Sequence, residues 1–331
     1  MHTFIHQFFE LTITGLAVGA IYALVALGYT MVYGVLQLIN FAHSEVFMYG
    51  TFAMAWVFVF IHGTGSVQES LWQAAPILIV ALIAAMAVSG GVALLVERFA
   101  YRPLITRDAP KLVALISAIG ASFALSEAMG LRDRIAGWFG LQGTLTNYVS
   151  NARNNYSNPI SITHHDLFKV GDYWVNDIDV LVIAAALVMM VGLELFVRRT
   201  RAGRSIRAVA EDPEAASLMG INSTRTIQLT FLIGGLMAGV AATLYMVRIG
   251  TTYSGAGFTL GVKAFTAAVM GGIGNLRGAL LGGLILGVAE NWGSAFFGDT
   301  WKDVVSFALL VLILLVRPSG ILGESLRKAR A

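Results

Sequence analysis

The sequence has no cysteine and little charge. The absence of cysteine excludes disulfides, iron–sulfur clusters and thiol catalysis, although it leaves the redox compartment open. Charged residues make up only 12% of the 331 residues, whereas hydrophobic residues make up 57% and the mean hydropathy is +0.74. A soluble protein of this length normally has a larger fraction of charged residues. The composition therefore favours a lipid bilayer as the solvent.

Signatures of common catalytic sites are also missing. The sequence contains no Gly-x-Ser-x-Gly elbow, no His-Glu-x-x-His zinc helix and no glycine-rich run ending in Gly-Lys-Ser or Gly-Lys-Thr. We therefore expect neither catalysis nor a cofactor bound by this chain. His164, His165 and Asp166 are adjacent but lack further ligands at a usable spacing, so we expect no metal site. The 22 Lys and Arg residues gather in a few loops, which argues against nucleic-acid binding.

Long apolar runs predict an all-α, polytopic membrane protein, because a spanning helix needs about 20 mainly apolar residues. Six runs are clear: 11–38, 41–61, 76–96, 112–131, 180–197 and 227–247. Three others are short and interrupted by glycines: 258–270, 279–290 and 301–316. They are typical of broken or re-entrant helices. Nine crossings result if every segment spans, and eight is the alternative.

The basic residues predict the orientation, since Lys and Arg near span ends stay in the cytoplasm. They form three clusters: Arg98, Arg102, Arg107 and Lys111; Arg198, Arg199, Arg201, Arg204, Arg207 and Arg225; and Arg317, Arg327, Lys328 and Arg330. Counting spans between them places the N-terminus, with an uncleaved first span, in the periplasm. We expect one transmembrane domain over 1–331, with a periplasmic loop at 131–179, a cytoplasmic loop at 198–226 and a cytoplasmic tail at 317–331.

Two further features are open to more than one interpretation. The loop at 131–179 is rich in Asn, Ser and Thr and carries aromatic residues, which either anchor it at the membrane interface or form a platform for an extracytoplasmic partner. Glycines recur four residues apart, a spacing that lets helix backbones approach closely in lipid. The pairs are Gly15 and Gly19, Gly235 and Gly239, Gly278 and Gly282, and Gly283 and Gly287.

The cytoplasmic loop contains the signals of a short helix between residues 212 and 220. Asp212 can cap its start, Pro213 suits its first position, Glu214 complements the helix dipole and Gly220 can end it. Spacings of three and four residues then place three residues on one small apolar face: Ala215, Leu218 and Met219. A rigid projection of this kind can fill a groove in a partner.

Residues 214–216, Glu-Ala-Ala, followed by Gly220, resemble the EAA-type loop of ABC importer permeases, although the Ile and Leu-Pro of the fullest motif are missing. In that family the loop forms a coupling helix that docks on the ATPase, which implies such a role for Asp212, Pro213, Glu214, Ala215, Ala216, Leu218, Met219 and Gly220. Other segments resemble the H-type permease of branched-chain amino acid importers: 40–45, 97–104, 115–120, 261–274, 302–308 and 318–323. Ser44 departs from the family, which commonly has Gly there.

The resemblance implies a bacterial inner-membrane subunit that imports leucine, isoleucine or valine by alternating access. Its implied partners are cytoplasmic ATPases that bind ATP and Mg, a periplasmic binding protein and a second, paralogous permease, with a homodimer as the alternative. Related permeases serve other amino acids, amides or urea. An ion-coupled transporter or channel is the competing class, which the coupling-type loop disfavours.

The segments at 40–54 and 253–270 share a polar entry, a glycine and a small-residue helix, and they open spans from opposite sides of the membrane. An inverted repeat with discontinuous helices explains this pattern; chance similarity of Ala- and Gly-rich helices is the alternative. We expect the translocation pathway to involve Asn40, His43, Ser44, Glu45, Tyr253, Lys263, Thr266 and Glu290. Glu45 and Lys263 either pair or snorkel to the interface. Glu127 and Glu194 lie near span ends and carry less weight.

Overall fold

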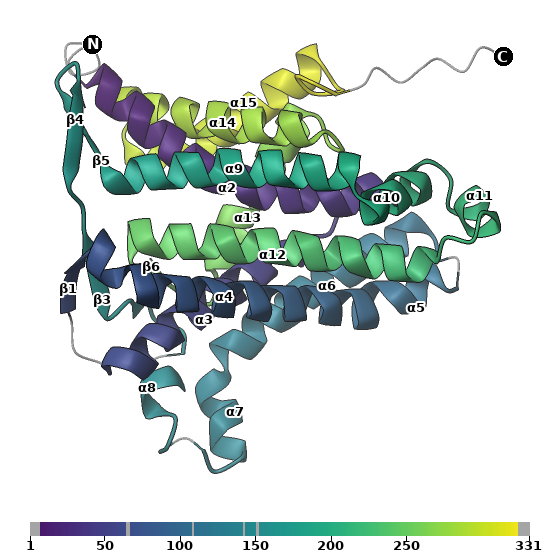
Figure 1. Cartoon of the computed structure of the whole chain (residues 1–331), viewed down its shortest axis with the longest axis horizontal. Helices are drawn as coiled ribbons and strands as arrows, with labels where there is room; N and C mark the ends of the chain where they lie inside the picture. The colour runs from purple at the N-terminus through teal and green to yellow at the C-terminus, as the bar shows by residue number, and fades with distance from the viewer. Residues whose placement is uncertain (1–6, 64–66, 108, 142, 150–151, 324–331) are drawn as a thin grey trace. The chain divides into compact units, whose positions relative to one another are not determined.

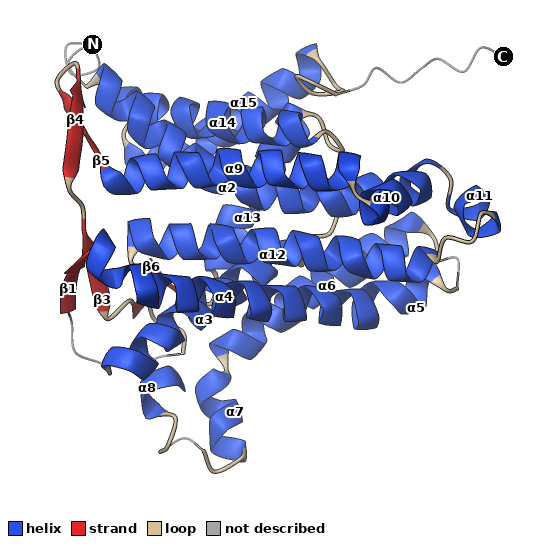
Figure 2. Ribbon diagram, viewed as in Figure 1, coloured by secondary structure: helices blue, strands red, loops and turns tan. Residues whose placement is uncertain are grey.

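Helices dominate the computed structural model, which describes residues 7–63, 67–107, 109–141, 143–149 and 152–323 (Figure 2). The described chain forms two compact units built from interleaved segments. The first contains residues 1–37, 166–226 and 262–331, and the second contains residues 38–165 and 227–261. Of the expected basic tail, Arg327, Lys328 and Arg330 lie outside the described residues.

The first unit is a helix bundle with one hairpin (Figure 1). Its elements are α2 (Phe8–Leu36), β4 (Asp166–Val170), β5 (Tyr173–Asn176), α9 (Asp177–Arg199), α10 (Arg201–Glu211), α11 (Pro213–Leu218), α14 (Leu276–Phe297), η2 (Asp299–Trp301) and α15 (Lys302–Val316). It also holds the second part of α13 (Ala256–Gly271). Strands β4 and β5 pair antiparallel, and Asn176 then caps α9 by accepting a hydrogen bond from the Asp179 backbone N–H.

Direct backbone contact holds α2 against α14 in this unit. A Cβ atom added at Gly19 would lie 2.5 Å from the Gly283 carbonyl oxygen, and one at Gly287 would lie 2.3 Å from the Gly15 carbonyl oxygen. The two pairs at four-residue spacing, Gly15 with Gly19 and Gly283 with Gly287, therefore face each other. This confirms the close helix packing predicted from their spacing.

Helix α14 is longer than the sequence predicts, and the contacts of its glycines explain the difference. The glycines had suggested a short, interrupted segment at 279–290, yet α14 continues over 22 residues from Leu276 to Phe297. Its glycines lie against neighbouring backbones: Gly278 and Gly282 contact the end of α13, and Gly283 and Gly287 contact α2. Packing contacts offset the low helix propensity of glycine, so the helix does not break.

The second unit combines helices with two small strand pairs. Its elements are α3 (His43–His62), β1 (Val67–Ser70), α4 (Leu71–Val96), η1 (Glu97–Tyr101), α5 (Arg102–Ile105), α6 (Lys111–Gly130), α7 (Arg132–Trp138), α8 (Thr146–Val149), β2 (Tyr156–Ser157), β3 (Ile160–Thr163) and β6 (Thr251–Thr252). Most of α12 (Ser223–Ile249) and the first turns of α13 complete it. Strand β1 pairs parallel with β3, and β2 pairs antiparallel with β6.

Small residues also set the packing of α3, α4 and α12. A Cβ atom added at Gly239 would lie 2.6 Å from the Met86 Cα, and one at Gly235 would lie 2.8 Å from the Ser89 carbonyl oxygen. The Ser89 hydroxyl in turn donates to the Val46 carbonyl oxygen at 3.0 Å. This buried hydroxyl thereby fixes α4 against the first turns of α3.

A π-helical turn at Glu97–Tyr101 joins α4 to α5 and keeps the helix continuous up to Pro103. Proline cannot donate a backbone hydrogen bond, and a π turn relieves the clash that its ring causes. The buried Glu97 carboxylate is held by two hydrogen bonds from Arg102, at 2.6 and 3.1 Å. The Glu97 and Arg102 of the quoted sequence motif therefore form one structural contact.

The first part of the segment at 131–179 packs against α3. Arg132 is buried and donates to the backbone carbonyls of Met129 and Ala152 at 3.1 and 2.7 Å. Its guanidinium lies 4.8 Å from the Phe52 ring centroid and 5.8 Å from that of Tyr156. Burial lowers the pKa of the Arg132 guanidinium and raises the pKa of the Tyr156 phenol. One arginine thus ties α7 and the following segment to α3.

Seven helices in the described part of the chain are long and apolar enough to cross a bilayer: α2, α3, α4 with its continuation, α6, α9, α12 and α14. Helices α13 and α15 are shorter, at 16 and 15 residues. Each of the nine expected segments is therefore helical, and an all-α polytopic protein is confirmed. The number of crossings stays a prediction.

We predict that Gly19→Ala destabilises the protein by about 1–3 kcal/mol, because its methyl group would overpack the contact between α2 and α14. Gly34→Ala is the matched control in the same helix, since a Cβ atom there meets no other group within 4 Å. The control should be neutral or stabilising by up to about 1 kcal/mol, through helix propensity. Thermal unfolding in detergent measures both; equal midpoints for the two variants would contradict the proposed packing constraint.

Candidate functional site

Helix α11 is a capped helix of six residues, Pro213–Leu218. The Asp212 side chain accepts hydrogen bonds from the backbone N–H groups of Glu214 and Ala215 at 2.9 and 3.0 Å. Pro213 occupies the first turn, and Gly220 ends the helix with a φ of +82°, a backbone conformation that favours glycine. The predicted helix and its start and stop signals are confirmed.

One face of α11 is apolar and uncovered. Leu218 is 87% exposed and Met219 is 83% exposed, and Ala215 lies beside them on the exposed side. Ala216, the next residue after Ala215, is buried. Two large apolar side chains at the tip of a polar loop form a surface suited to a groove in a partner.

Helix α10 fixes the base of this loop on α9. Thr200 caps α10 by accepting from the Gly203 backbone N–H at 2.9 Å, and a Cβ atom at Gly203 would lie 2.3 Å from the Val197 carbonyl oxygen. Arg207 also donates to the Val197 carbonyl oxygen. Ile206 and Val209 are buried as α10 packs on α9 and α2. The chain therefore turns tightly from the membrane helix into a rigid support for α11.

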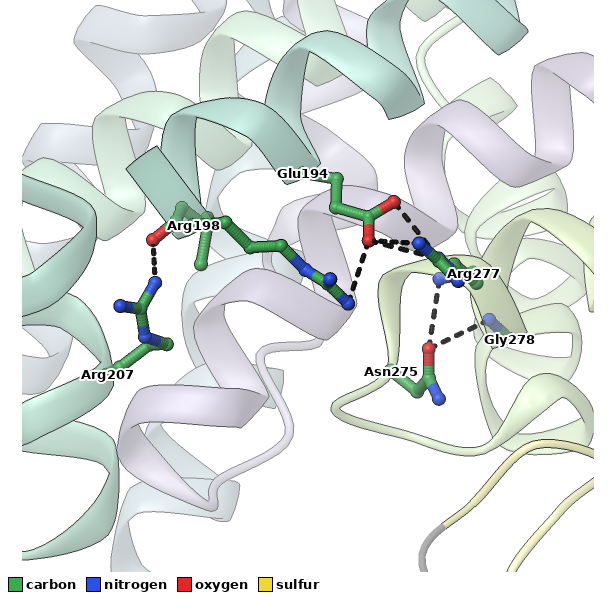
Figure 3. A network of polar contacts seen from close by, with 7 residues as sticks. Glu194, Arg198, Arg207, Asn275, Arg277 and Gly278 are labelled. Carbon is green, nitrogen blue, oxygen red and sulfur yellow. Dashed lines mark hydrogen bonds and ion pairs between the residues drawn. The ribbon is translucent and has the colours of Figure 1, made fainter. Parts of the chain in front are cut away.

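An ion network joins the end of α9 to the start of α14 (Figure 3). Glu194 lies 2.7 Å from Arg277 Nη2 and 3.0 Å from Arg198 Nη2, and Arg277 Nε donates to both of its carboxylate oxygens. Asn275 caps α14 through the N–H groups of Arg277 and Gly278. The sequence argument had given Glu194 little weight, because nothing local indicates a partner more than 80 residues away.

In the second unit, the residues that start α3 are buried polar groups. Asn40 Oδ1 accepts a hydrogen bond from Tyr101 at 3.2 Å, which ties the approach to α3 to the π-helical turn. Ser44 donates to the Phe41 carbonyl oxygen at 2.7 Å, and His43 is buried beside it. Tyr101 is a contributor that the sequence argument missed; its place in the quoted motif 97–104 was the available signal.

Glu45 lies in the first turn of α3 and is 1% exposed. Its Oε1 accepts a hydrogen bond from Ser122 of α6 at 3.3 Å, whereas its Oε2 has no hydrogen-bond partner in the described structure. Gly257, in the first turn of α13, packs directly on it: an added Cβ atom would lie 2.6 Å from Glu45 Oε2. The first turns of two predicted discontinuous helices therefore meet at a carboxylate, although the inverted repeat itself stays a prediction.

Tyr253 lies just before this contact, partly exposed, with its hydroxyl 3.1 Å from Thr259 Oγ1. The next residue, Ser254, accepts a hydrogen bond from Ser126 of α6 through its carbonyl oxygen, at 2.7 Å. Ser122 and Ser126 are four residues apart on α6 and contact the starts of both α3 and α13. Neither serine stands out in sequence, because isolated serines are common in apolar helices.

In the first unit, Lys263 forms ion pairs with Glu290 at 3.1 Å and Asp303 at 2.8 Å. From the sequence, Lys263 is expected either to pair with Glu45 or to snorkel to the interface, and neither of these two partners is indicated. Glu290 is 1% exposed and also accepts hydrogen bonds from the hydroxyls of Tyr22, at 2.8 Å, and Ser306. Both of its carboxylate oxygens are thus satisfied. This arrangement is typical of a structural lock between α2, α13, α14 and α15.

Thr266 is also buried, and its hydroxyl has no hydrogen-bond partner in the described part of the chain. Within that same part, no group of three or more His, Asp or Glu residues could hold a metal ion, and His164 and His165 are not in such a group. A role for Asn40, His43, Ser44, Glu45, Tyr253, Lys263, Thr266 and Glu290 in the pathway stays a prediction.

Apolar spanning helices, buried ion contacts and a projecting capped helix define a multi-pass membrane transport subunit. The sequence matches the family model described as "Branched-chain amino acid transport system / permease component" over residues 11–314. The chain belongs to this family of transport permeases, which are not enzymes.

Curated relatives match almost the whole chain. It is 41% identical to the high-affinity branched-chain amino acid transport system permease protein BraD of Pseudomonas aeruginosa, covering 97% of each chain. It is 40% identical to the permease LivH of Escherichia coli, covering 97% of this chain and 96% of LivH. A probable LivH of Methanocaldococcus jannaschii is 24% identical over 93% of this chain. No solved structure matches.

We predict that Lys263→Met destabilises the protein by about 3–5 kcal/mol, because it leaves the buried Glu290 carboxylate without a cation. The double variant Lys263→Met with Glu290→Gln should recover a large part of this loss, since Asp303 is 62% exposed at its side chain and can remain hydrated. Thermal unfolding in detergent measures both variants. A double variant that is less stable than the single one would contradict the ion-pair assignment.

Proposed function

We propose that this chain is a membrane permease subunit of an ATP-driven importer and that α11 is the element that receives force from the ATPase. The uncovered face of Ala215, Leu218 and Met219 carries this proposal. A cytoplasmic helix gains nothing from two exposed apolar side chains unless a partner covers them. ATP and Mg are bound by separate ATPase subunits.

Force on α11 would pass into the first unit through rigid contacts. Asp212 ends α10 and caps α11, α10 packs on α9 and α2, and Arg277 joins the end of α9 to α14. Each joint is a hydrogen bond, an ion pair or a close backbone contact, so a push on α11 is transmitted to the spans instead of bending the loop. This supports alternating access driven from outside the chain.

The substrates we propose are leucine, isoleucine and valine, because the curated relatives are named for branched-chain amino acid transport. Other amino acids, amides and urea are the alternative substrates. The binding protein does much of the selection, so the permease sequence alone discriminates poorly between them.

The full assembly we propose contains two ATPases, a periplasmic binding protein and a second permease, a paralogue of this chain in preference to a second copy. The Arg-rich segment around α10 and α11 supports a cytoplasmic position for this loop and a cytoplasmic C-terminus, with the N-terminus in the periplasm. The segment at 131–179 would then face the binding protein.

We predict that Ala215→Arg abolishes the coupling of ATP hydrolysis to uptake, because it places a long charged side chain in the apolar docking face. Ser217→Arg is the matched control: it adds the same charge to the same helix, about 200° away from Ala215. The ATPase and uptake activities of the assembled complex in proteoliposomes measure the effect. Normal coupling in Ala215→Arg, or equal loss in Ser217→Arg, would refute docking through this face.

We also predict that the chain reconstituted alone shows no concentrative leucine uptake under any ion gradient. Adding the ATPases, the second permease, the binding protein and ATP should produce uptake. Affinity purification from the native membrane supplies these partners and identifies the ligand on the binding protein. Robust gradient-driven uptake by the isolated chain would contradict the ABC assignment and favour a secondary transporter.

A further inference from the structure

The contact between the first turns of α3 and α13 is chemically unusual within the second unit. Glu45 is a carboxylate buried to 1% exposure, yet only its Oε1 has a hydrogen-bond partner, Ser122. Its Oε2 faces Gly257 and has none in the described chain. A buried carboxylate with an unsatisfied oxygen is costly, so a protein keeps one where a cation or a proton completes it.

Two of the other buried carboxylates, Glu97 and Glu290, show how a structural role can satisfy such a group. Glu97 accepts two hydrogen bonds from Arg102. Glu290 forms an ion pair with Lys263 and accepts hydrogen bonds from the hydroxyls of Tyr22 and Ser306. Each of these two carboxylates is paired with a cationic side chain, and both of its oxygens have a partner. Glu45 is buried to the same extent but is held by one serine at 3.3 Å. Its environment therefore fixes the position of the carboxylate but, within the described part of the chain, supplies no cation and no hydrogen-bond donor for Oε2.

The groups around Glu45 also allow this contact to open. Gly257 and Gly261 present backbone to Ser44 and Glu45, and added Cβ atoms would lie 2.6 Å from the Ser44 carbonyl oxygen and 2.2 Å from Ser44 Cβ, respectively. Because Gly257 and Gly261 have no side chains, nothing interdigitates at these two positions when the two first turns separate.

We propose that Glu45 is a substrate-binding residue whose Oε2 accepts a hydrogen bond from the ammonium group of the transported amino acid when the first turns of α3 and α13 separate. An ammonium group supplies both the positive charge and the donor that Glu45 lacks. This inference rests on the proposed function, because it takes an amino acid as the substrate. Ser122 is a positioning residue that orients the carboxylate through Oε1.

The test uses the complete complex in proteoliposomes, with leucine-loaded binding protein outside and ATP inside. Glu45→Gln keeps the size of the side chain and removes its charge. We expect leucine uptake per ATP hydrolysed to fall by about tenfold or more, the loss that follows removal of a hydrogen bond to a charged group. ATPase stimulation by the binding protein should persist. Glu45→Asp, which retains the charge, should lie between Glu45→Gln and the wild type.

Two controls separate substrate binding from structural damage. Glu127→Gln neutralises an exposed carboxylate paired with Arg153 and should leave the uptake ratio unchanged. Ser122→Ala should lower the leucine uptake per ATP hydrolysed. Ser117 lies on the same helix, α6, and donates to the Ala100 carbonyl oxygen, so Ser117→Ala also removes one hydrogen bond but should leave this ratio unchanged. If Glu45→Gln fails to assemble, this serine pair decides the question.

The outcomes distinguish this inference from the proposed function. No ATP-driven uptake of leucine or of any other amino acid by the wild-type complex would overturn both. Wild-type uptake with an unchanged ratio in Glu45→Gln would overturn the role of Glu45 alone, as would equal ratios in Ser122→Ala and Ser117→Ala.

Discussion

Direct contact between helix backbones, permitted by glycine, is the constraint on which the rest of the structure depends. Lipid tails are as apolar as the side chains of a helix, so the hydrophobic effect does not drive helices together in a bilayer. Helices associate instead where their backbones approach closely and pack well. Gly19 and Gly283 provide that approach in the first unit, and Gly239 provides it against Met86 in the second. Once these backbones are fixed, the polar side chains they carry have defined partners. Tyr22 and Glu290, on the two helices joined by the glycine contact, are an example.

Polar groups inside each unit add specificity to this packing. Glu290 with Lys263 joins helices that apolar contacts alone would leave free to slide or rotate, and Glu97 with Arg102 fixes the π-helical turn between α4 and α5. Breaking either pair leaves a charge in a medium that solvates it poorly, which makes the native arrangement strongly preferred over close alternatives. The network of Glu194, Arg198 and Arg277 applies the same principle at the end of α9, where the support of α11 begins.

Local signals made α11 predictable from sequence, and long-range contacts made other features unpredictable. Asp212, Pro213 and Gly220 act within a few residues of one another, so their positions define both ends of the helix. The partners of Lys263 come from α14 and α15, and no local pattern indicates them. The glycines of α14 allowed two expectations, an interrupted helix and close packing, and only their neighbours in space decide that they pack the helix. The contacts of Arg132 could not be predicted either, because its aromatic neighbours come from distant segments.

The contrast between Glu45 and Glu290 shows why burial alone does not identify a functional carboxylate. Both are 1% exposed and both lie among apolar helices. Glu290 has a cation and two hydroxyl donors, so the fold accounts for its charge completely. Glu45 has a single weak donor and faces a glycine backbone, so the fold positions the charge without compensating it. Such an incomplete site calls for a group that completes it during the working cycle, and under the proposed function the ammonium group of each substrate molecule would be that cation.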